Sequence, residues 1–307
     1  MPKAERASER SQAGTEQSNL RRGLLQGVLA YGLWGGVAAY WKPLAAVDPV
    51  ELVAHRALWG LGAFAVFVAI SGQLGALRAA LRDVRTIGVM AASGALLAIN
   101  WAIFVWATLN GHLLDASLGY FMNPLCSVAL GTIVLRERLS RLQWIAIVLA
   151  MIGVGFLTWR AGRVPWVALV LAPTFAFYGL LRKTAKVPAL IGSTIETLLM
   201  VPIALIYLIV ISDRAAFGHA GASITALLVG TGIVTAVPLV LFTSAARRLP
   251  LSTVGFLQYL TPTGQFLLAV TLFDEPLALD RLGAFIVIWT ALVVFAIDLF
   301  RSRPRSP

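Results

Sequence analysis

The sequence predicts an all-α integral membrane protein with ten transmembrane helices that form two inverted five-helix repeats. Composition is the first observation: 59% of the 307 residues are hydrophobic, 13% are charged, and the mean hydropathy is +0.82. Soluble domains are roughly 45–50% apolar and about 25% charged. The second observation is a set of apolar segments long enough to cross a bilayer. The third is a motif in the fourth segment that recurs in the ninth.

The predicted spans follow from the thickness of the bilayer. A hydrocarbon core of about 30 Å needs about 20 residues of helix. The apolar segments of about that length are 23–41, 50–70, 87–109, 113–135, 142–159, 166–181, 190–211, 223–243, 251–273 and 282–300. Residues 1–20 have no apolar core and predict a disordered cytoplasmic tail. We expect the repeats at 21–159 and 160–300, and a basic cytoplasmic tail at 301–307.

The basic residues predict the orientation of the chain. Of the 25 Lys and Arg residues, 19 lie in the breaks on the side that holds both termini, and five lie on the other side. The remaining one, Arg56, lies inside the second span. Because cytoplasmic loops carry the excess of Lys and Arg, both termini are expected in the cytoplasm. The net charge of +11 therefore reflects membrane topology, and no nucleic-acid partner is expected.

Several function classes lack the residues that they need. A single cysteine, Cys126, excludes an intrachain disulfide, and the histidines His55, His112 and His219 form no HExxH motif. No metal, cofactor or catalytic residue is expected. The chain contains no GxxxxGK[ST] loop for ATP, so any pumping would draw on an ion gradient or on partner exchange.

An internal repeat links the two halves. Pro124 precedes Glu137 by 13 residues in NPLCSVALGTIVLRERL, and Pro262 precedes Glu275 by 13 in TPTGQFLLAVTLFDEPL. ASLGYF and STVGFL extend the match upstream, although with a two-residue offset. Five spans per half make the second half enter the membrane in the opposite sense. Prolines inside spans free carbonyl groups, so we expect helix breaks at Pro124 and Pro262 that line a pocket, with a plain packing kink as the alternative.

Long strings of this sequence resemble one family closely. They are GLWGGVAAYWKPLAAVDPVELVAHR, NWAIFVWATLNGHLLDASLGYFMNPL, RERLSRLQW, FYGLLRKTAKVPALIGSTIETLLM and AVPLVLFTSAARRLPLSTVGFLQYLTPTGQFLLAV. They resemble the RarD branch of the EamA-type drug/metabolite transporter superfamily, from about residue 21 to 300. The resemblance implies a ten-helix permease of the bacterial inner membrane, with a cavity surrounded by helices one to four and six to nine. It also implies proton-driven export of small metabolites.

The charges of the second span need partners. Arg56 is costly inside lipid unless it faces an acid or water. Its predicted partner is Glu196 of the seventh span, and we expect both side chains to face one cavity. Two roles are open: a permanent structural ion pair, or a pair that opens when Glu196 is protonated and frees Arg56 for an anionic group. His55 is a further proton-coupling candidate because its ordinary pKa is about 6.5. Asp115 is either a helix cap or a third proton-coupling candidate.

Polar and aromatic side chains near the middle of the spans are the candidate substrate contacts. Buried amides should face a cavity or another helix, and tryptophans can stack on a planar or cationic substrate. With Arg56 and Glu196, the predicted substrate-binding residues are Trp34, Asn100, Trp101, Tyr120, Asn123, Tyr178, Gln258 and Tyr259. Trp41, Trp159 and Trp166 lie near span ends and are interpreted as interface anchors.

The remaining spans predict lipid contacts. The fifth is almost free of polar groups and the tenth has few, so both should face lipid. Gly153 and Gly155 would allow the close helix contact that a homodimer needs. The predicted function is alternating-access transport that exports a small metabolite, amino acid or drug-like compound. An intramembrane enzyme and a channel or sensory scaffold are the alternatives.

Overall fold

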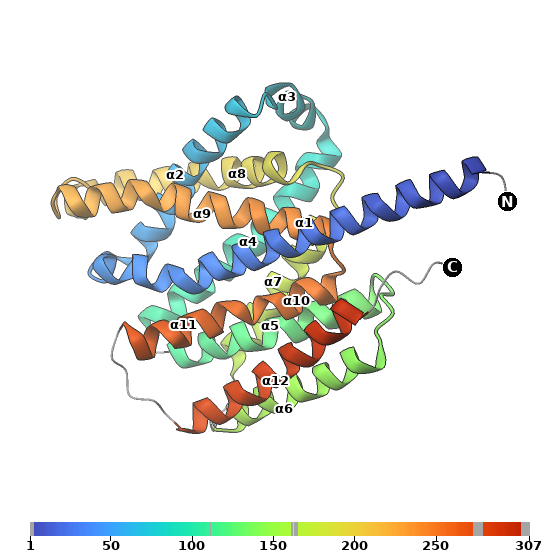
Figure 1. The fold of residues 1–307 in the computed structure, drawn as a ribbon. Coiled ribbons are helices and arrows are strands. Elements are labelled where there is room, and N and C mark those ends of the chain that lie inside the picture. Colours follow the sequence, from blue (N-terminus) through green and yellow to red (C-terminus); the bar gives the residue numbers. More distant parts are fainter. Residues whose placement is uncertain (1–2, 111, 161, 163–164, 273–278, 302–307) are drawn as a thin grey trace.

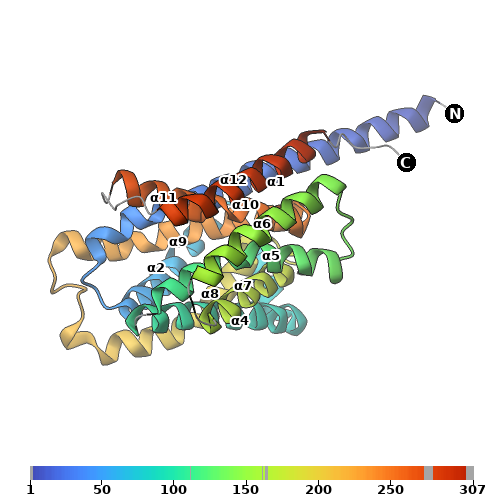
Figure 2. The same cartoon turned by 90° about the horizontal axis from the view of Figure 1, so that it is seen from below.

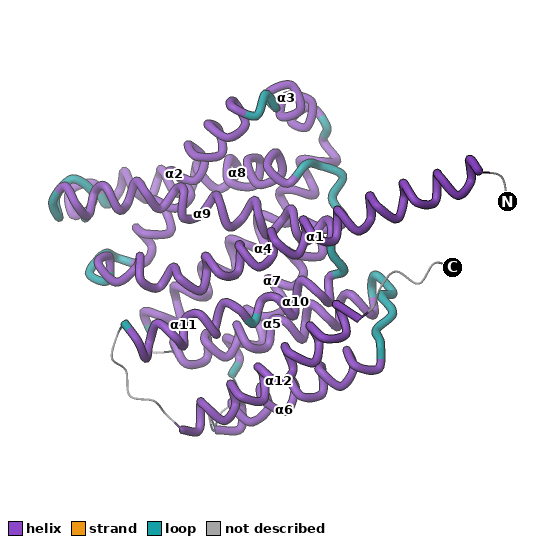
Figure 3. The backbone as a smooth tube through the Cα atoms, viewed as in Figure 1, coloured by secondary structure: helices purple, strands orange, loops and turns teal. Residues whose placement is uncertain are grey.

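The computed structural model describes residues 3–110, 112–160, 162, 165–272 and 279–301, and the regular secondary structure of these residues is all helix, joined by loops and turns (Figures 1 and 3). The all-α prediction is confirmed. Within the described residues, six helices are long and apolar enough to cross a membrane, as expected of a multi-pass membrane protein. The α-helices are α1 (Lys3–Trp41), α2 (Pro49–Ile70), α3 (Leu74–Arg82), α4 (Val84–Leu109), α5 (Leu113–Ile133), α6 (Arg141–Arg160), α7 (Trp166–Thr184), α8 (Ala189–Val210), α9 (Ala222–Arg248), α10 (Leu251–Gln258), α11 (Leu260–Thr271) and α12 (Leu279–Arg301), with 3₁₀-helices at Lys42–Leu44 and Ser212–Arg214.

Each predicted apolar segment is helical, with one interruption. The ninth segment is divided into α10 and α11 at Tyr259. The break lies three residues before Pro262, whose ring removes a backbone donor. The break predicted at Pro124 is wrong, because α5 continues through that proline as one helix. A proline is compatible with a continuous membrane helix where neighbouring groups satisfy the freed carbonyl.

The predicted tail is also different. The structure extends α1 back to Lys3, so the disorder predicted for residues 1–20 is not observed. Ala, Glu, Arg and Gln dominate this stretch and all favour helix. No proline interrupts it after residue 2. In both ribbon views this part of α1 projects beyond the bundle (Figures 1 and 2).

Side-chain caps set the starts of two helices. The Asp48 carboxylate accepts the backbone N–H groups of Val50 and Glu51 at 2.9 and 3.0 Å, and Pro49 takes the first position of α2. Asp83 caps α4. The Thr86 hydroxyl donates to it at 2.5 Å, and this bond, with the N–H of Arg85, holds the pKa of the carboxyl below its usual value.

The helices form one bundle with two distinct ends. Both termini, α3 and the α9–α10 connection lie at one end, here called the terminal end, and the α1–α2 and α8–α9 connections lie at the other, the far end (Figure 1). The pair α6 and α12 packs together along one side of the bundle (Figures 1 and 2). Gly153 of α6 faces Ile288 of α12 within the same chain, whereas nothing lies near Gly155. Gly153 is therefore engaged in intrachain packing rather than free for a dimer.

Two carboxylates tie separate parts of the chain together at the two ends. At the far end, the buried Glu51 accepts the backbone N–H groups of Ala216 and Phe217, both at 3.1 Å. At the terminal end, Glu137 accepts the N–H groups of Leu251 and Ser252 at 2.6 and 3.0 Å. The second contact caps the N-terminus of α10, where a negative charge is stabilising.

A tight contact between α2 and α9 makes Gly232 sensitive to substitution. A Cβ atom added to Gly232 would lie 2.3 Å from the carbonyl oxygen of Trp59, a backbone atom that cannot move aside. Gly232→Ala should therefore lower the stability by about 1–3 kcal/mol, the usual range for overpacking. Gly62→Ala on the same helix pair is the control, because nothing lies within 4 Å of that position. Thermal unfolding in detergent measures both, and equal melting temperatures would contradict the packing described.

Candidate functional site

A cavity of about 380 Å³ lies between the two sequence halves. Its wall comes from α1, α2, α4 and α5 of the first half and from α7, α9, α10 and α11 of the second. Cavities between helices of a bundle are common small-molecule sites, usually largely apolar with a few convergent polar groups. Helices α6 and α12 contribute no described residue to the lining, in agreement with a role away from the cavity.

Most of the predicted contact residues line this cavity. The predicted residues in the lining are Trp34, Arg56, Asn100, Trp101, Tyr120, Asn123, Gln258 and Pro262. Sequence reasoning missed others, and the polar and aromatic ones are Tyr31, Trp41, Phe104, Ser117, Phe175, Thr235, Thr261 and Gln265. Helical spacing was the available signal, since residues three, four or seven apart share a face. Trp41 follows Trp34 by seven residues, and Gln265 follows Gln258 by seven.

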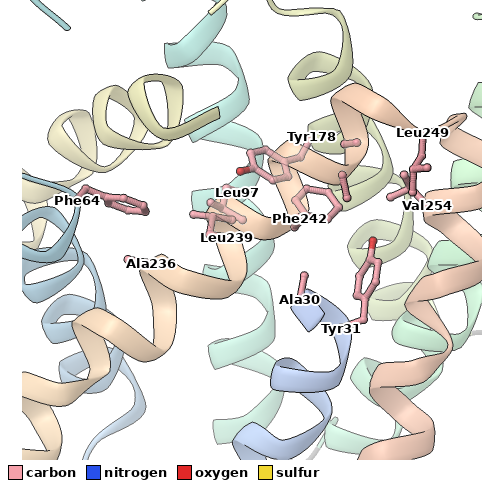
Figure 4. Close-up of a cluster of buried hydrophobic side chains, with 12 residues drawn as sticks. Ala30, Tyr31, Phe64, Leu97, Tyr178, Ala236, Leu239, Phe242, Leu249 and Val254 are labelled. Atoms are coloured by element: carbon pink, nitrogen blue, oxygen red, sulfur yellow. The ribbon is translucent and has the colours of Figure 1, made fainter. Parts of the chain in front are cut away.

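The cavity occupies the half of the bundle toward the far end. On α1 the lining runs from Tyr31 to Trp41, the last residue of the helix, and on α2 it includes Val53, close to the first residue. On α7 it includes Leu171, five residues from the start. Toward the terminal end, an aromatic and aliphatic cluster fills the space between the helices (Figure 4).

The cluster consists of interlocking rings. Tyr31 packs edge-on against Phe242 at 5.9 Å between ring centroids, and Tyr178 stacks on Phe242 at 5.9 Å and 16°. Trp34 contacts the same ring of Phe242 at 5.7 Å, so the cluster continues into the cavity wall. Figure 4 shows the side chains of Tyr31, Tyr178 and Phe242, which come from α1, α7 and α9. Tyr178 therefore belongs to this cluster and not to the cavity lining.

Arg56 is the charged group of the lining. Its Nε donates to the Thr235 hydroxyl at 3.2 Å, and its guanidinium carbon lies 4.5 Å from the ring centroid of Trp101 and 5.5 Å from that of Trp41. Cation–π contacts of this kind stabilise a desolvated cation. Among the described lining residues there is no Asp or Glu. Arg56 thus stands in the cavity with aromatic rather than acidic neighbours.

The predicted pairing of Arg56 with Glu196 is wrong. Glu196 lies outside the cavity lining, and its partner is the fully buried Arg182 of α7, with 3.5 Å between Nη1 and Oε1. The Ser93 and Tyr178 hydroxyls also donate to the Glu196 carboxylate, the latter at 3.3 Å. The sequence placed Arg182 in a loop after a span that ends at 181. The helix in fact continues to Thr184 and carries Arg182 into the bundle.

The surroundings of Arg182 fit the guanidinium closely. Its Nη2 donates to the Ala189 carbonyl at 2.8 Å, and a Cβ added to Gly192 would overlap Nη1. The helix that carries Glu196, α8, packs on α2, α4 and α9 and contributes no described residue to the cavity. The expectation that all eight inner helices line the cavity is therefore corrected for α8.

The other candidates lie elsewhere. His55 is buried at the far end, 3.7 Å from Glu51, stacked on Phe217 and bonded through Nδ1 to the Trp59 indole N–H at 3.1 Å. Tyr259 is buried beside Phe256 and does not line the cavity. Asp115 belongs to the first turn of α5, but its side chain is outside the described part of the structure.

The amide side chains form hydrogen bonds within and between helices, and they also form part of the cavity wall. Asn100 donates through Nδ2 to the Leu171 carbonyl at 2.9 Å and to the Thr174 hydroxyl at 3.0 Å, which joins α4 to α7. Its amide N–H groups are thus engaged, and its oxygen is the atom left for a cavity contact. Asn123 accepts from the Ser127 hydroxyl at 3.5 Å within α5.

A multi-pass helical bundle with a cavity between its two halves has the architecture that membrane transporters use. Comparison with known proteins identifies the kind of transporter. Residues 21–159 match the model of the EamA-like transporter family. The chain belongs to this family, whose members are transporters and not enzymes.

The similar proteins span nearly the whole chain. An uncharacterized transporter of Pseudomonas aeruginosa is 47% identical over 94% of this chain and 98% of its own length. Protein RarD of Escherichia coli is 43% identical over 93% of this chain and 97% of its own length. One solved crystal structure has a TM-score of 0.71 at 18% identity and covers 91% of this chain and 98% of that chain, so the fold is shared.

The buried ion pair generates a stability prediction. Arg182→Gln leaves the Glu196 carboxylate buried without its cation, and Glu196→Gln leaves the guanidinium without its anion. Each single change should cost about 3–5 kcal/mol, whereas the double variant should recover most of the loss because neither charge is then stranded. Thermal unfolding of the four purified proteins measures the coupling. If the two single losses simply add in the double variant, the two side chains do not interact.

Proposed function

We propose that this protein is a secondary-active permease that moves a small molecule by alternating access. The observation that carries the proposal is the cavity, walled by both halves, reaching the far end along α1 and filled with packed rings toward the terminal end. The cavity is thus closed toward the terminal end and less closed toward the far end. Rocking of the two halves would reverse which end is closed. The family membership supports the same conclusion.

The proposed topology has ten spans, with α10 and α11 together forming the ninth. The two five-helix repeats, 21–159 and 160–300, are inverted relative to each other. Both termini are cytoplasmic, because the Lys and Arg residues concentrate at the terminal end. The far end then faces the periplasm of a bacterial cell, and the direction of net transport is export of a small metabolite, amino acid or drug-like compound.

Cysteine labelling tests this orientation. Ser71 lies between α2 and α3, at the terminal end, and Ser212 lies in the α8–α9 connection, at the far end. Both side chains are exposed, and each is changed to Cys in a Cys126→Ala background. We expect a membrane-impermeant maleimide to label Ser212→Cys in intact spheroplasts and to label Ser71→Cys only after permeabilisation. Labelling of both positions from the same side would exclude the ten-span topology.

The coupling ion is proposed to be a proton. Glu196 is the strongest candidate carrier, because its carboxylate is buried and is held by a cation and two hydroxyl donors whose geometry depends on its charge. Protonation would weaken the contact with Arg182 and loosen α7 from α8. His55 and Asp115 are the other candidate proton carriers, since each lies in the N-terminal part of its helix, near the far end.

Flux in proteoliposomes tests both transport and coupling. Wild-type protein should accumulate at least one compound from a panel of amino acids, aromatic metabolites, phenicols and quaternary ammonium compounds under an imposed pH gradient. A protonophore should abolish the accumulation. The variant Arg182→Gln/Glu196→Gln should keep downhill flux and lose accumulation, because the proton site is removed without a stranded charge.

Three outcomes would count against these claims. Accumulation that survives the protonophore, or that persists in the double variant, would exclude Glu196 as the proton site. Absence of flux for every compound, with correctly inserted protein, would favour a membrane scaffold or sensor over a permease.

A further inference from the structure

We propose that the cavity binds an organic anion, with one carboxylate-sized head on Arg56 and a planar apolar body against the aromatic wall. This inference names the substrate class and rests on the proposed transport function. It is carried by the arrangement of charge in the cavity, where a cation is built into a site whose described lining has no acid.

The position of Arg56 is the first step. A charged side chain inside a membrane bundle is costly unless it is paired or faces a cavity. Thr235 takes one N–H, and Trp101 and Trp41 cover parts of the guanidinium. Neither terminal nitrogen of Arg56 has a hydrogen-bond acceptor among the described residues. The guanidinium fork therefore keeps the donors that bind a carboxylate in a bidentate manner.

The second step is that two acids of the helices around Arg56, Glu51 and Glu196, are engaged with other groups. Glu51, on the same helix as Arg56, accepts two backbone N–H groups of the far-end loop. Glu196, on α8, is paired with Arg182. Neither carboxylate is available to neutralise Arg56 in this conformation. An anionic ligand would thus supply the counter-charge that the described lining residues do not provide.

The third step concerns the rest of the wall. Trp34 and Phe175 meet edge to face at 6.2 Å, and Phe104 meets Tyr120 in the same manner at 5.9 Å. These rings offer apolar faces for a planar body. A volume of about 380 Å³ is near the lower end of the roughly 300–1,000 Å³ typical of ligand pockets. The body is therefore small, on the scale of one or two rings.

The same charges disfavour other cargoes. A quaternary ammonium compound would meet a like charge at Arg56 and no acid in the described lining. The rings of Trp101 and Trp41 already face a cation, so their use in stacking on a cationic substrate is blocked. A neutral compound would leave the guanidinium donors unmatched, which costs affinity in a buried site.

A matched ligand series tests the inference. The probes are 3-phenylpropionate, 3-phenylpropanamide and 3-phenylpropylamine, which share one body and differ in head-group charge. We expect the carboxylate to raise the melting temperature of the purified protein, and to bind at least about tenfold more tightly than the amide or the amine, which corresponds to about 1.4 kcal/mol. Arg56→Gln should abolish the shift, and Arg56→Lys should retain a smaller one.

A control variant separates Arg56 from a general effect of losing an arginine. Arg78→Gln removes an exposed arginine of α3 that is not part of the lining, and it should keep the full carboxylate shift. Loss of the shift in Arg78→Gln would overturn the assignment to Arg56.

Other results would also overturn it. These are equal shifts with all three probes, a carboxylate shift that persists in Arg56→Gln, or no shift with the carboxylate at millimolar concentration. Binding in detergent requires no gradient and no flux, so this experiment is separate from the transport test. If a carboxylate binds at Arg56 while no compound of the transport panel crosses the bilayer, the permease proposal fails and the anion site still stands.

Discussion

The cost of placing charge and unpaired backbone inside an apolar bundle governs this structure. Lipid offers no hydrogen bonds, so each polar group within the bundle needs a protein partner or a cavity. Glu196 and Arg182 satisfy each other, with two hydroxyl groups completing the carboxylate shell. Arg56 is satisfied differently, by aromatic faces and by access to the cavity. Glu196 and Arg182 thus form a closed pair outside the cavity lining, whereas Arg56 is a cation that faces the cavity.

The same constraint explains how the ends of the bundle are held. Glu51 and Glu137 each accept a pair of backbone N–H groups from a distant part of the chain. At the terminal end, Lys183 also donates to the carbonyl of Leu249, so the α9–α10 corner is held from both sides. Arg136, with φ of 55°, turns the chain after α5 and brings Glu137 to this corner. These contacts lie beside the ring cluster that closes the cavity on that side.

The cavity is closed toward the terminal end by packed aromatic rings and not by ion pairs, and this affects how the bundle can change conformation. Ring packing is short-range and carries no net charge, so separating Tyr31 from Phe242 exposes apolar surface but strands no ion. Opening the Glu196–Arg182 pair, in contrast, strands two charges unless the carboxylate is protonated. A bundle with both features can separate its rings without stranding a charge, whereas it can open the ion pair without stranding a charge only when the carboxylate is protonated. This is the physical basis of the coupling that we propose.

Periodicity and composition determined much of this protein without coordinates. Each apolar segment corresponds to helix in the structure, because twenty apolar residues in a row have few other stable arrangements. The start of α1 and the division of the ninth segment into α10 and α11 did not follow from the apolar pattern. The sequence also identified five residues that line the cavity: Trp34, Asn100, Trp101, Asn123 and Gln258. The three amides were identifiable because an amide in a membrane helix is unfavourable in lipid and favourable beside a cavity.

Only the tertiary structure decided which partner each charged side chain has. The end of α7 differs from its predicted position by three residues, and that difference converts Arg182 from a loop cation into the partner of Glu196. Helix ends are weakly encoded, since a solvated last turn costs little either way. Likewise, nothing in the sequence of α8 shows that it packs behind α9 and outside the cavity, because that depends on which faces of several helices meet. The sequence determined which side chains must find a partner or a cavity, and the packing of the helices decided which one each of them found.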